Sequence, residues 1–251
     1  MVSGHFKLKR LSRQEHLILI AFSFLFTINI AISNVSLAMV SVPFHQIARS
    51  TSPIATVAIY RCFYNRSYSS ATYLSLLPVV IGVVLSVYGD LDYTMLGATL
   101  TFLGVVLASV KTVATNRIMT GSLALPALEV LLRMSPLAAV QSITYAYMTG
   151  ELDVFMKFSA EGNLTTPLVI ALLGNGFLAF MLNVTSFQTN KLAGALTITV
   201  CGNIKQCLTI LLGVVLFNVQ VGVLNGLGML VTLAGAAWYS KVEVDAKRQR
   251  K

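Results

Sequence analysis

Apolar residues occur in long, nearly uninterrupted stretches that short polar segments separate. A stretch of about 20 apolar residues is long enough to cross a bilayer as a helix. Eight stretches reach or approach that length, and they cover residues 16–40, 42–63, 73–89, 94–115, 126–149, 166–188, 192–217 and 219–240. Because the connections are short, we expect neighbouring helices to be antiparallel. The pattern predicts an all-α polytopic membrane protein with about eight transmembrane helices.

The composition supports this prediction and excludes other classes of protein. Apolar residues make up 56% of the 251 residues and charged residues only 11%, whereas soluble domains carry about 25% charged residues. The mean hydropathy is +0.78. A soluble enzyme and an intrinsically disordered chain are therefore excluded. The net charge of +9 would suggest nucleic acid for a soluble protein, but here it raises the question of where the cations lie.

The cations indicate how the chain is oriented, because cytoplasmic segments of membrane proteins are enriched in lysine and arginine. With a cytosolic N-terminus, only Lys157 falls on the opposite side of the membrane. The cytosolic segments then hold Lys7, Lys9, Arg10, Arg13, Arg61, Arg66, Arg117, Lys191, Lys241, Lys247, Arg248, Arg250 and Lys251. We expect a basic cytosolic N-terminus (1–15), a helical bundle (16–240) and a basic cytosolic tail (241–251). No nucleic-acid partner is expected.

Ionisable residues inside the bilayer are costly, roughly 2.5–3.5 kcal/mol each on insertion scales, and mark functional sites by default. The predicted spans contain four cations, Arg49, Lys111, Arg133 and Lys205, and one acid, Glu129. Glu129 and Arg133 are four residues apart, which places them on one face of a helix. We expect them to form a structural ion pair, and a gating or substrate role is the alternative.

Arg49, Lys111 and Lys205 have no acidic partner inside any predicted span. Lys111 lies near the cytosolic end of its span, where its side chain could instead extend to the membrane surface. Arg49 and Lys205 lie deeper, so we expect a bound anion to balance their charge. This favours a phosphate-bearing solute as the substrate.

Polar residues accompany these cations on two predicted spans. Asn203 and Gln206 flank Lys205, and Asn29, Ser33 and Ser36 follow one face of the first span. The alternative for each is a hydrogen bond between helices, worth about 0.6 kcal/mol on average in membranes. For the first-span residues this alternative is the better explanation, whereas we take Asn203 and Gln206 as candidate substrate-binding residues.

The two deep cations are related by a weak internal repeat. An offset of 156 residues brings Arg49 onto Lys205, on spans that cross the membrane in opposite senses. Inverted repeats of this kind are common in transporters. The first repeat would comprise three helices (16–89) and the second repeat five (94–240). We therefore expect alternating access around a cationic site at the membrane midplane, and two helices would be missing from the first repeat.

The residues around both cations resemble a known family. The run VSVPFHQIAR, which ends at Arg49 and precedes Ser52-Pro53, is similar to the segment VSVSFxxxxKAxxP of the triose-phosphate/nucleotide-sugar translocator family, in the drug/metabolite transporter superfamily. The run ALTITVCGNIKQ, in which Lys205 is the lysine, resembles the family segment LTxxVGNxxKR. The resemblance implies ten helices in two inverted five-helix repeats, of which this chain would be a remnant. It also implies that Arg49 replaces a phosphate-binding lysine.

The departures from the family pattern restrict the function that the resemblance implies. Gln206 stands where the family motif has an arginine, which disfavours triose-phosphate exchange of the plastid kind. The chain is therefore expected to be an antiporter for a nucleotide-sugar or a sugar phosphate, in a Golgi or endoplasmic reticulum membrane. The alternative is a truncated, non-transporting membrane protein with a regulatory or vestigial role.

Other chemistry in the sequence is limited. The spans contain no metal-ligand cluster, activated nucleophile or carboxylate pair, so we expect neither an enzyme nor a cofactor. Asn163 begins a glycosylation sequon in a non-cytosolic loop and is the candidate acceptor. Gly222 and Gly226 form a GxxxG motif, which we expect to serve packing within the bundle, with a homodimer as the alternative.

Overall fold

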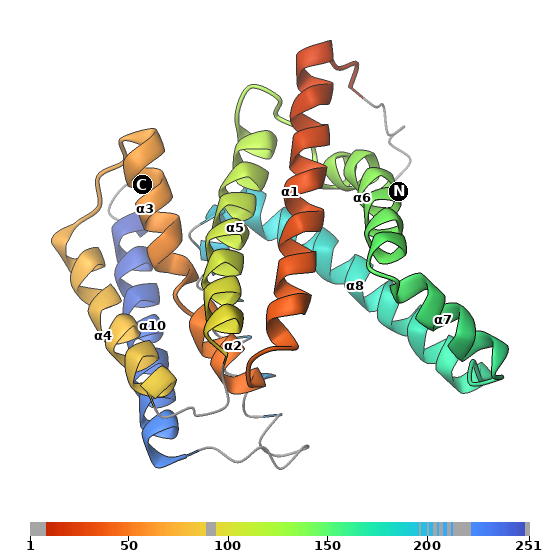
Figure 1. The fold of residues 1–251 in the computed structure, drawn as a ribbon. Coiled ribbons are helices and arrows are strands. Elements are labelled where there is room, and N and C mark those ends of the chain that lie inside the picture. Colours follow the sequence, from red (N-terminus) through yellow and green to blue (C-terminus); the bar gives the residue numbers. More distant parts are fainter. Residues whose placement is uncertain are drawn as a thin grey trace. The chain divides into compact units, whose positions relative to one another are not determined.

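A computed structural model describes residues 9–88, 94–195, 197–199, 201–202, 205, 208–209, 212 and 222–248. The elements in these residues are helices, with no strand among them (Figure 1). They are α1 (Arg13–Leu37), α2 (Val42–Arg49), α3 (Ser52–Tyr64), α4 (Ser70–Tyr88), α5 (Met95–Thr120), α6 (Ala127–Met148), α7 (Glu151–Ala160), α8 (Thr166–Ala193) and α10 (Val223–Arg248). The prediction of an all-α protein is confirmed for the described residues.

Three of the described helices, α1, α5 and α8, are long and apolar enough to cross a membrane, and α4 contains a shorter apolar helix. The helix α6 corresponds to the predicted stretch 126–149, and α10 overlaps the stretch 219–240. Most of the stretch 192–217 lies outside the described residues. The total of eight spans therefore stays a prediction.

The predicted stretch 42–63 does not form one continuous helix in the structure. The segment divides into α2, which ends at Arg49, and α3, which begins at Ser52. Ser50 and Thr51 separate the two helices. Pro53 has no N–H to donate to the carbonyl of Arg49 four residues earlier. Instead, the Ser52 hydroxyl donates to that carbonyl at 2.6 Å, and the Thr51 hydroxyl donates to the carbonyl of Ala48 at 2.6 Å. These local bonds replace the helical ladder and end α2 at Arg49.

The chain divides into two compact units, and neither unit is continuous in sequence. Unit 1 combines residues up to Ile28 with Ala114–Leu192, and unit 2 combines Asn29–Val113 with residues from Ala193 onward. The predicted inverted repeats relate residues 16–89 to residues 94–240 by symmetry. The division into compact units does not test that symmetry. The repeat boundaries therefore stay a prediction.

The core of unit 1 forms where α1 packs against α6 and the end of α8. Leu19 and Phe22 of α1 are buried together with Val130 and Met134 of α6 and Phe187 of α8. The rings of Phe22 and Phe187 meet edge to face, with their centroids 6.5 Å apart. Two hydrogen bonds between α1 and α6 supplement this packing. The Thr27 hydroxyl donates to the Gln141 side chain at 2.8 Å, and the Gln141 amide donates to the Ser23 hydroxyl at 2.9 Å. Such packing and hydrogen bonds hold helices together in lipid.

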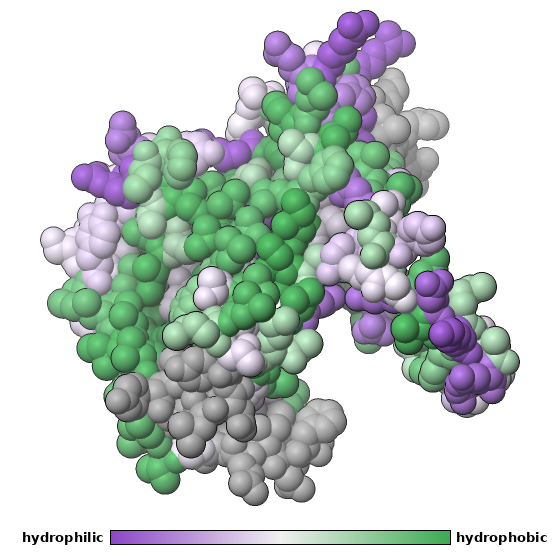
Figure 2. Space-filling model, viewed as in Figure 1, coloured by the Kyte–Doolittle hydropathy of each residue, from purple (hydrophilic) through white to green (hydrophobic). Residues whose placement is uncertain are grey.

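Among the described helices of unit 2, α4 packs closely against α10. A Cβ atom at Gly82 of α4 would collide with Thr232 and would lie 2.6 Å from the carbonyl oxygen of Gly228. A Cβ atom at Gly235 of α10 would lie 2.8 Å from the backbone nitrogen of Val79. The missing side chains therefore let the two backbones approach. In Figure 2, green apolar side chains cover the outward faces of α4 and α5, as expected for surfaces that contact lipid.

Candidate functional site

Three of the predicted site residues come together within unit 2, from three separate segments. Arg49 is the last residue of α2, Lys111 lies in α5, and Lys205 follows α8 in the chain. Their positive charges lie close enough to act on one another: Arg49 and Lys205 both repel Lys111, and Arg49 repels Lys205. A nearby like charge disfavours the charged form of each group unless an anion balances it. The cluster therefore favours an anion among the three cations.

Arg49 is held in place from α1. Its Nη1 atom donates to the hydroxyl oxygen of Ser33 at 2.6 Å. A guanidinium group has five N–H donors in a fixed fork, and this is its one hydrogen bond to a described residue. No carboxylate of the described residues lies within ion-pair distance of Arg49 or Lys205. Arg49 thus keeps donors that can bind an oxyanion.

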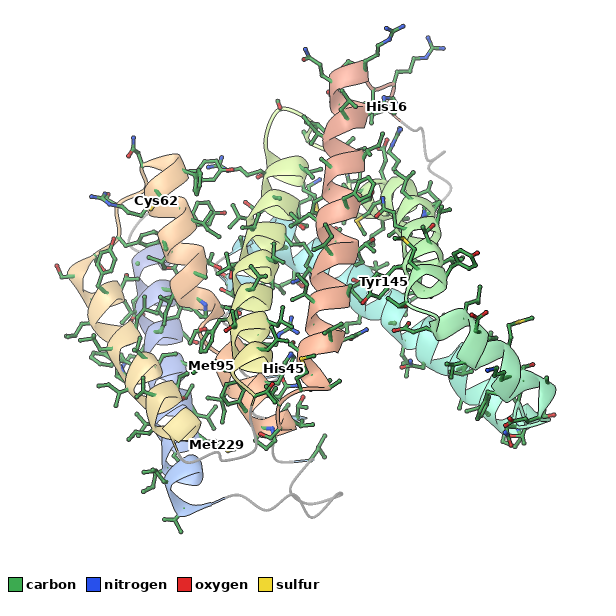
Figure 3. All side chains as sticks on the ribbon, viewed as in Figure 1. His16, His45, Cys62, Met95, Tyr145 and Met229 are labelled. Atoms are coloured by element: carbon green, nitrogen blue, oxygen red, sulfur yellow. The ribbon has the colours of Figure 1, made fainter. Side chains whose placement is uncertain are left out.

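His45 belongs to the same neighbourhood, although the sequence analysis gave it no role. It lies on α2 (Figure 3), four residues before Arg49. Only 4% of its surface is exposed. Its ring bonds to the backbone of Ser33, and its Nδ1 atom has no hydrogen-bond partner among the described residues. The spacing of four residues from Arg49 is the signal that could have identified it.

The other polar residues of the first predicted span have structural roles. Asn29 donates from its amide to the carbonyl of Gly104 on α5 at 3.1 Å, and Ser36 donates to the carbonyl of Ser33 at 3.0 Å. Of the three, Ser33 is the one that contacts a predicted cation. Asn203 and Gln206 lie outside the described residues, so their predicted part in substrate binding stays a prediction.

The Glu129–Arg133 ion pair forms within unit 1, at the start of α6. Arg133 Nη2 lies 2.7 Å from Glu129 Oε1, and Glu129 is almost fully buried. The pair also holds the backbone of Lys9: the N–H of Lys9 donates to Glu129 Oε1 at 2.9 Å, and Arg133 Nη2 donates to the Lys9 carbonyl at 2.6 Å. The two side chains therefore bind the segment that precedes α1.

Further bonds join the same end of unit 1. Lys9 Nζ donates to the carbonyl of Leu123 at 2.8 Å, and Lys191 Nζ donates to the carbonyl of Leu125 at 3.4 Å. The segment before α1, the α5–α6 connection and the end of α8 thus lie together.

Replacing Glu129 by alanine is expected to release the segment around Lys9. The substitution removes the acceptor of the Lys9 N–H and leaves Arg133 without its partner, which costs about 1–3 kcal/mol locally. Hydrogen exchange should accelerate at residues 9–13 in E129A but not in E151A, which changes an exposed acid of the same unit. Equal exchange in both variants would show that Glu129 does not hold the segment.

The remaining candidates lie at the surface. Asn163 is exposed between α7 and α8, where its amide donates to Glu161 at 3.0 Å, and its glycosylation stays a prediction. Cys62 and Cys201 are exposed free thiols. No cluster of three potential metal ligands occurs among the described residues.

The chain is similar to a known protein family and to several of its members. The model of the Triose-phosphate Transporter family matches residues 1–240. A probable sugar phosphate/phosphate translocator of Arabidopsis thaliana is 30% identical over 240 residues, which are 94% of this chain and 66% of that protein. From the same plant, UDP-galactose transporter 1 is 28% identical over 88% of this chain and 65% of its own length. A GDP-mannose transporter is 26% identical over 91% of this chain and 66% of its own length. The chain thus spans just under two thirds of the length of these relatives.

Proposed function

Because the chain belongs to the Triose-phosphate Transporter family, whose members are transporters rather than enzymes, we propose that it carries a phosphorylated organic anion across a membrane. The substrate is a nucleotide-sugar or a sugar phosphate. The observation that carries this proposal is the convergence of Arg49, Lys111 and Lys205 within unit 2. Arg49 and Lys205 have no carboxylate of the described residues beside them.

The chemistry of the three cations suits a phosphate group. A guanidinium binds two phosphate oxygens at once, whereas an ammonium group acts as a compact positive charge. A phosphate monoester carries between about −1.5 and −2 charges at neutral pH, which offsets most of the repulsion among three cations. Arg49 would bind phosphate oxygens while Ser33 fixes the guanidinium. Lys111 and Lys205 would supply the remaining positive charge.

The proposed substrate class follows from both the relatives and the sequence. The relatives named above include a sugar phosphate/phosphate translocator, a UDP-galactose transporter and a GDP-mannose transporter. The substrates in these names all contain a sugar that is linked to phosphate. Gln206, at the position of the second basic residue in the family motif, favours a nucleotide-sugar over a triose phosphate in this chain.

Exchange of two anions is the proposed mode of transport. An empty site would leave three mutually repelling cations, and that repulsion strengthens when the site is closed to water. The return step is therefore favourable only with a second anion bound, which makes the carrier an antiporter. Alternating access around the Arg49–Lys205 pair of the predicted inverted repeat is the mechanism that this arrangement supports.

The proposed location is a Golgi or endoplasmic reticulum membrane, with both termini in the cytosol. The distribution of lysine and arginine supports this orientation. The bonds of Lys9 and Lys191 to the α5–α6 connection are consistent with it, because they bring together segments that are expected on one side of the membrane.

Replacing Arg49 by glutamine is expected to reduce exchange of a phosphorylated sugar in proteoliposomes at least about tenfold, since a hydrogen bond to a charged group contributes about 1.5–3 kcal/mol. Arg49→Lys should keep part of the activity because it keeps the charge. Arg61→Gln, which removes an exposed cation of α3, should leave exchange unchanged. Wild-type exchange by R49Q would rule out the proposed role of Arg49.

A further inference from the structure

The helix α7 (Glu151–Ala160) has no buried residue, although half of its residues are large and apolar. Leu152, Val154, Phe155, Met156 and Phe158 are between 37% and 68% exposed. A ten-residue helix is only about 15 Å long, half the thickness of the hydrocarbon core. It therefore cannot cross the bilayer, and some other environment must cover its apolar side chains.

The apolar residues of α7 gather on one face. With about 100° between successive residues of a helix, Leu152 and Phe158 lie about 60° on either side of Phe155. Val154 and Met156 border this face, whereas Asp153 and Lys157 lie on the opposite side. Glu151 lies about 40° from Phe155 on the same face, and it is the first residue of the helix, where a carboxylate interacts favourably with the helix dipole. The result is a short amphipathic helix centred on Phe155.

The chain tethers α7 to membrane-length helices at both ends. Only Thr149 and Gly150 separate it from α6, and Gly150 has a φ angle of +77°, which favours glycine and redirects the chain. Residues 161–165 connect it to α8, a reach of at most about 18 Å. The most apolar 18-residue window of α8 has no buried residue, so α8 offers its surface to lipid. Both tethers keep α7 at the level where α8 enters the bilayer.

We propose that α7 is an interfacial helix, which inserts the Phe155-centred face between lipid headgroups and acyl chains. This position would be on the non-cytosolic side. The opposite face, with Asp153 and Lys157, faces water. Figure 2 shows purple polar residues beside green apolar ones at the tip where Figure 1 places α7. Short amphipathic helices bind lipid in this way. The inference does not depend on which solute the protein carries.

The charges of this segment define the lipid that it fits. Residues 151–161 contain three acids, Glu151, Asp153 and Glu161, against Lys157. Binding to anionic lipids depends on clusters of lysine and arginine, which α7 does not have. Insertion of α7 therefore depends on its apolar area and does not require anionic headgroups.

Tryptophan fluorescence of the full chain in phosphatidylcholine proteoliposomes tests this inference. Trp238 is the single native tryptophan and is replaced by phenylalanine first. Phe155→Trp in that background should show blue-shifted emission and strong quenching by lipids brominated near the headgroup end of the acyl chain. The matched control, Lys157→Trp, lies on the opposite face and should be quenched by aqueous iodide instead.

Three outcomes would overturn the inference. Equal iodide quenching of the two tryptophans would place the Phe155 face in water. Blue-shifted emission from F155W without quenching by brominated lipid would show that protein, such as a second copy of the chain, covers this face. Quenching that appears only when phosphatidylserine is added would contradict the stated lipid preference. Phe158→Trp repeats the measurement on the same face and guards against a local defect of F155W.

Discussion

Replacing Lys205 by alanine is expected to abolish uptake of a phosphorylated solute into loaded proteoliposomes. Lys205 supplies one of three positive charges that converge in unit 2. Two unit charges 4 Å apart interact by about 4 kcal/mol at an effective dielectric constant of 20, and each 1.4 kcal/mol corresponds to a factor of about ten in affinity. Loss of this contact therefore weakens binding about a thousandfold. Initial uptake rates of a radiolabelled solute measure the effect.

The control for this experiment is Lys241→Ala, which removes an exposed cation of α10 in the same unit. Its uptake should equal that of the unsubstituted chain, and Lys205→Arg should retain part of the uptake because it retains the charge. Thermal unfolding of the purified variants checks that each protein is folded. Undiminished uptake by K205A would remove Lys205 from the proposed site.

The second large effect is expected at the α4–α10 contact, where Gly82→Ala should destabilise unit 2. The added methyl group would collide with Thr232 and lie 2.6 Å from the carbonyl oxygen of Gly228, and neither backbone can move without separating the helices. Overpacking of this kind costs typically 1–3 kcal/mol. A lower midpoint of thermal unfolding in detergent should show this loss.

Gly174→Ala on α8 is the matched control, because a Cβ atom there meets no atom within 4 Å. Alanine is about 0.5–1 kcal/mol more favourable than glycine inside a helix, so this variant should unfold at the same temperature or a higher one. If G82A unfolded at the same temperature as G174A, the close approach of α4 to α10 would not exist in the protein.

The long helices were predictable because length and hydropathy alone determine which segments can enter lipid. The predicted stretches 94–115, 126–149 and 166–188 correspond to α5, α6 and α8, with some ends displaced by up to five residues. Hydropathy gave residues 42–63 as one stretch because it does not register the local hydrogen bonds that separate α2 from α3. Pro53, which follows two hydroxyl residues, was the signal of that separation in the sequence.

The helix α7 was not predicted, since its ten residues include three charged ones and fall well below the length of a span. Its helical periodicity was visible, but only the structure shows that nothing within the described residues buries it. Short interfacial helices are found by periodicity rather than by mean hydropathy.

The sequence predicted charged residues of the candidate site, but it did not predict which residues lie near one another. The cost of placing Arg49 and Lys205 in lipid identified both residues, and the repeat offset paired them. Lys111 had an equally good alternative explanation, and only the structure brings its charge close to the other two. His45 was missed because its spacing of four residues from Arg49 is a weak signal by itself.

The Glu129–Arg133 pair shows a different limit. Spacing along a helix predicted the pair, which forms at 2.7 Å. Its third member, the backbone of Lys9, lies 120 residues away in the sequence. A backbone N–H and carbonyl are present at nearly every residue, so no residue type identifies the one that two side chains will bind.

Counter-exchange in proteoliposomes measures whether the chain exchanges phosphorylated sugars. Vesicles loaded with one solute are offered a panel of labelled nucleotide-sugars and sugar phosphates, with the corresponding unphosphorylated sugars as controls. We expect uptake of at least one phosphorylated solute that requires a phosphorylated counter-solute inside, and no uptake of the free sugars. Uptake no faster than into protein-free vesicles for every member of the panel would contradict the proposed exchange, and would favour the non-transporting alternative.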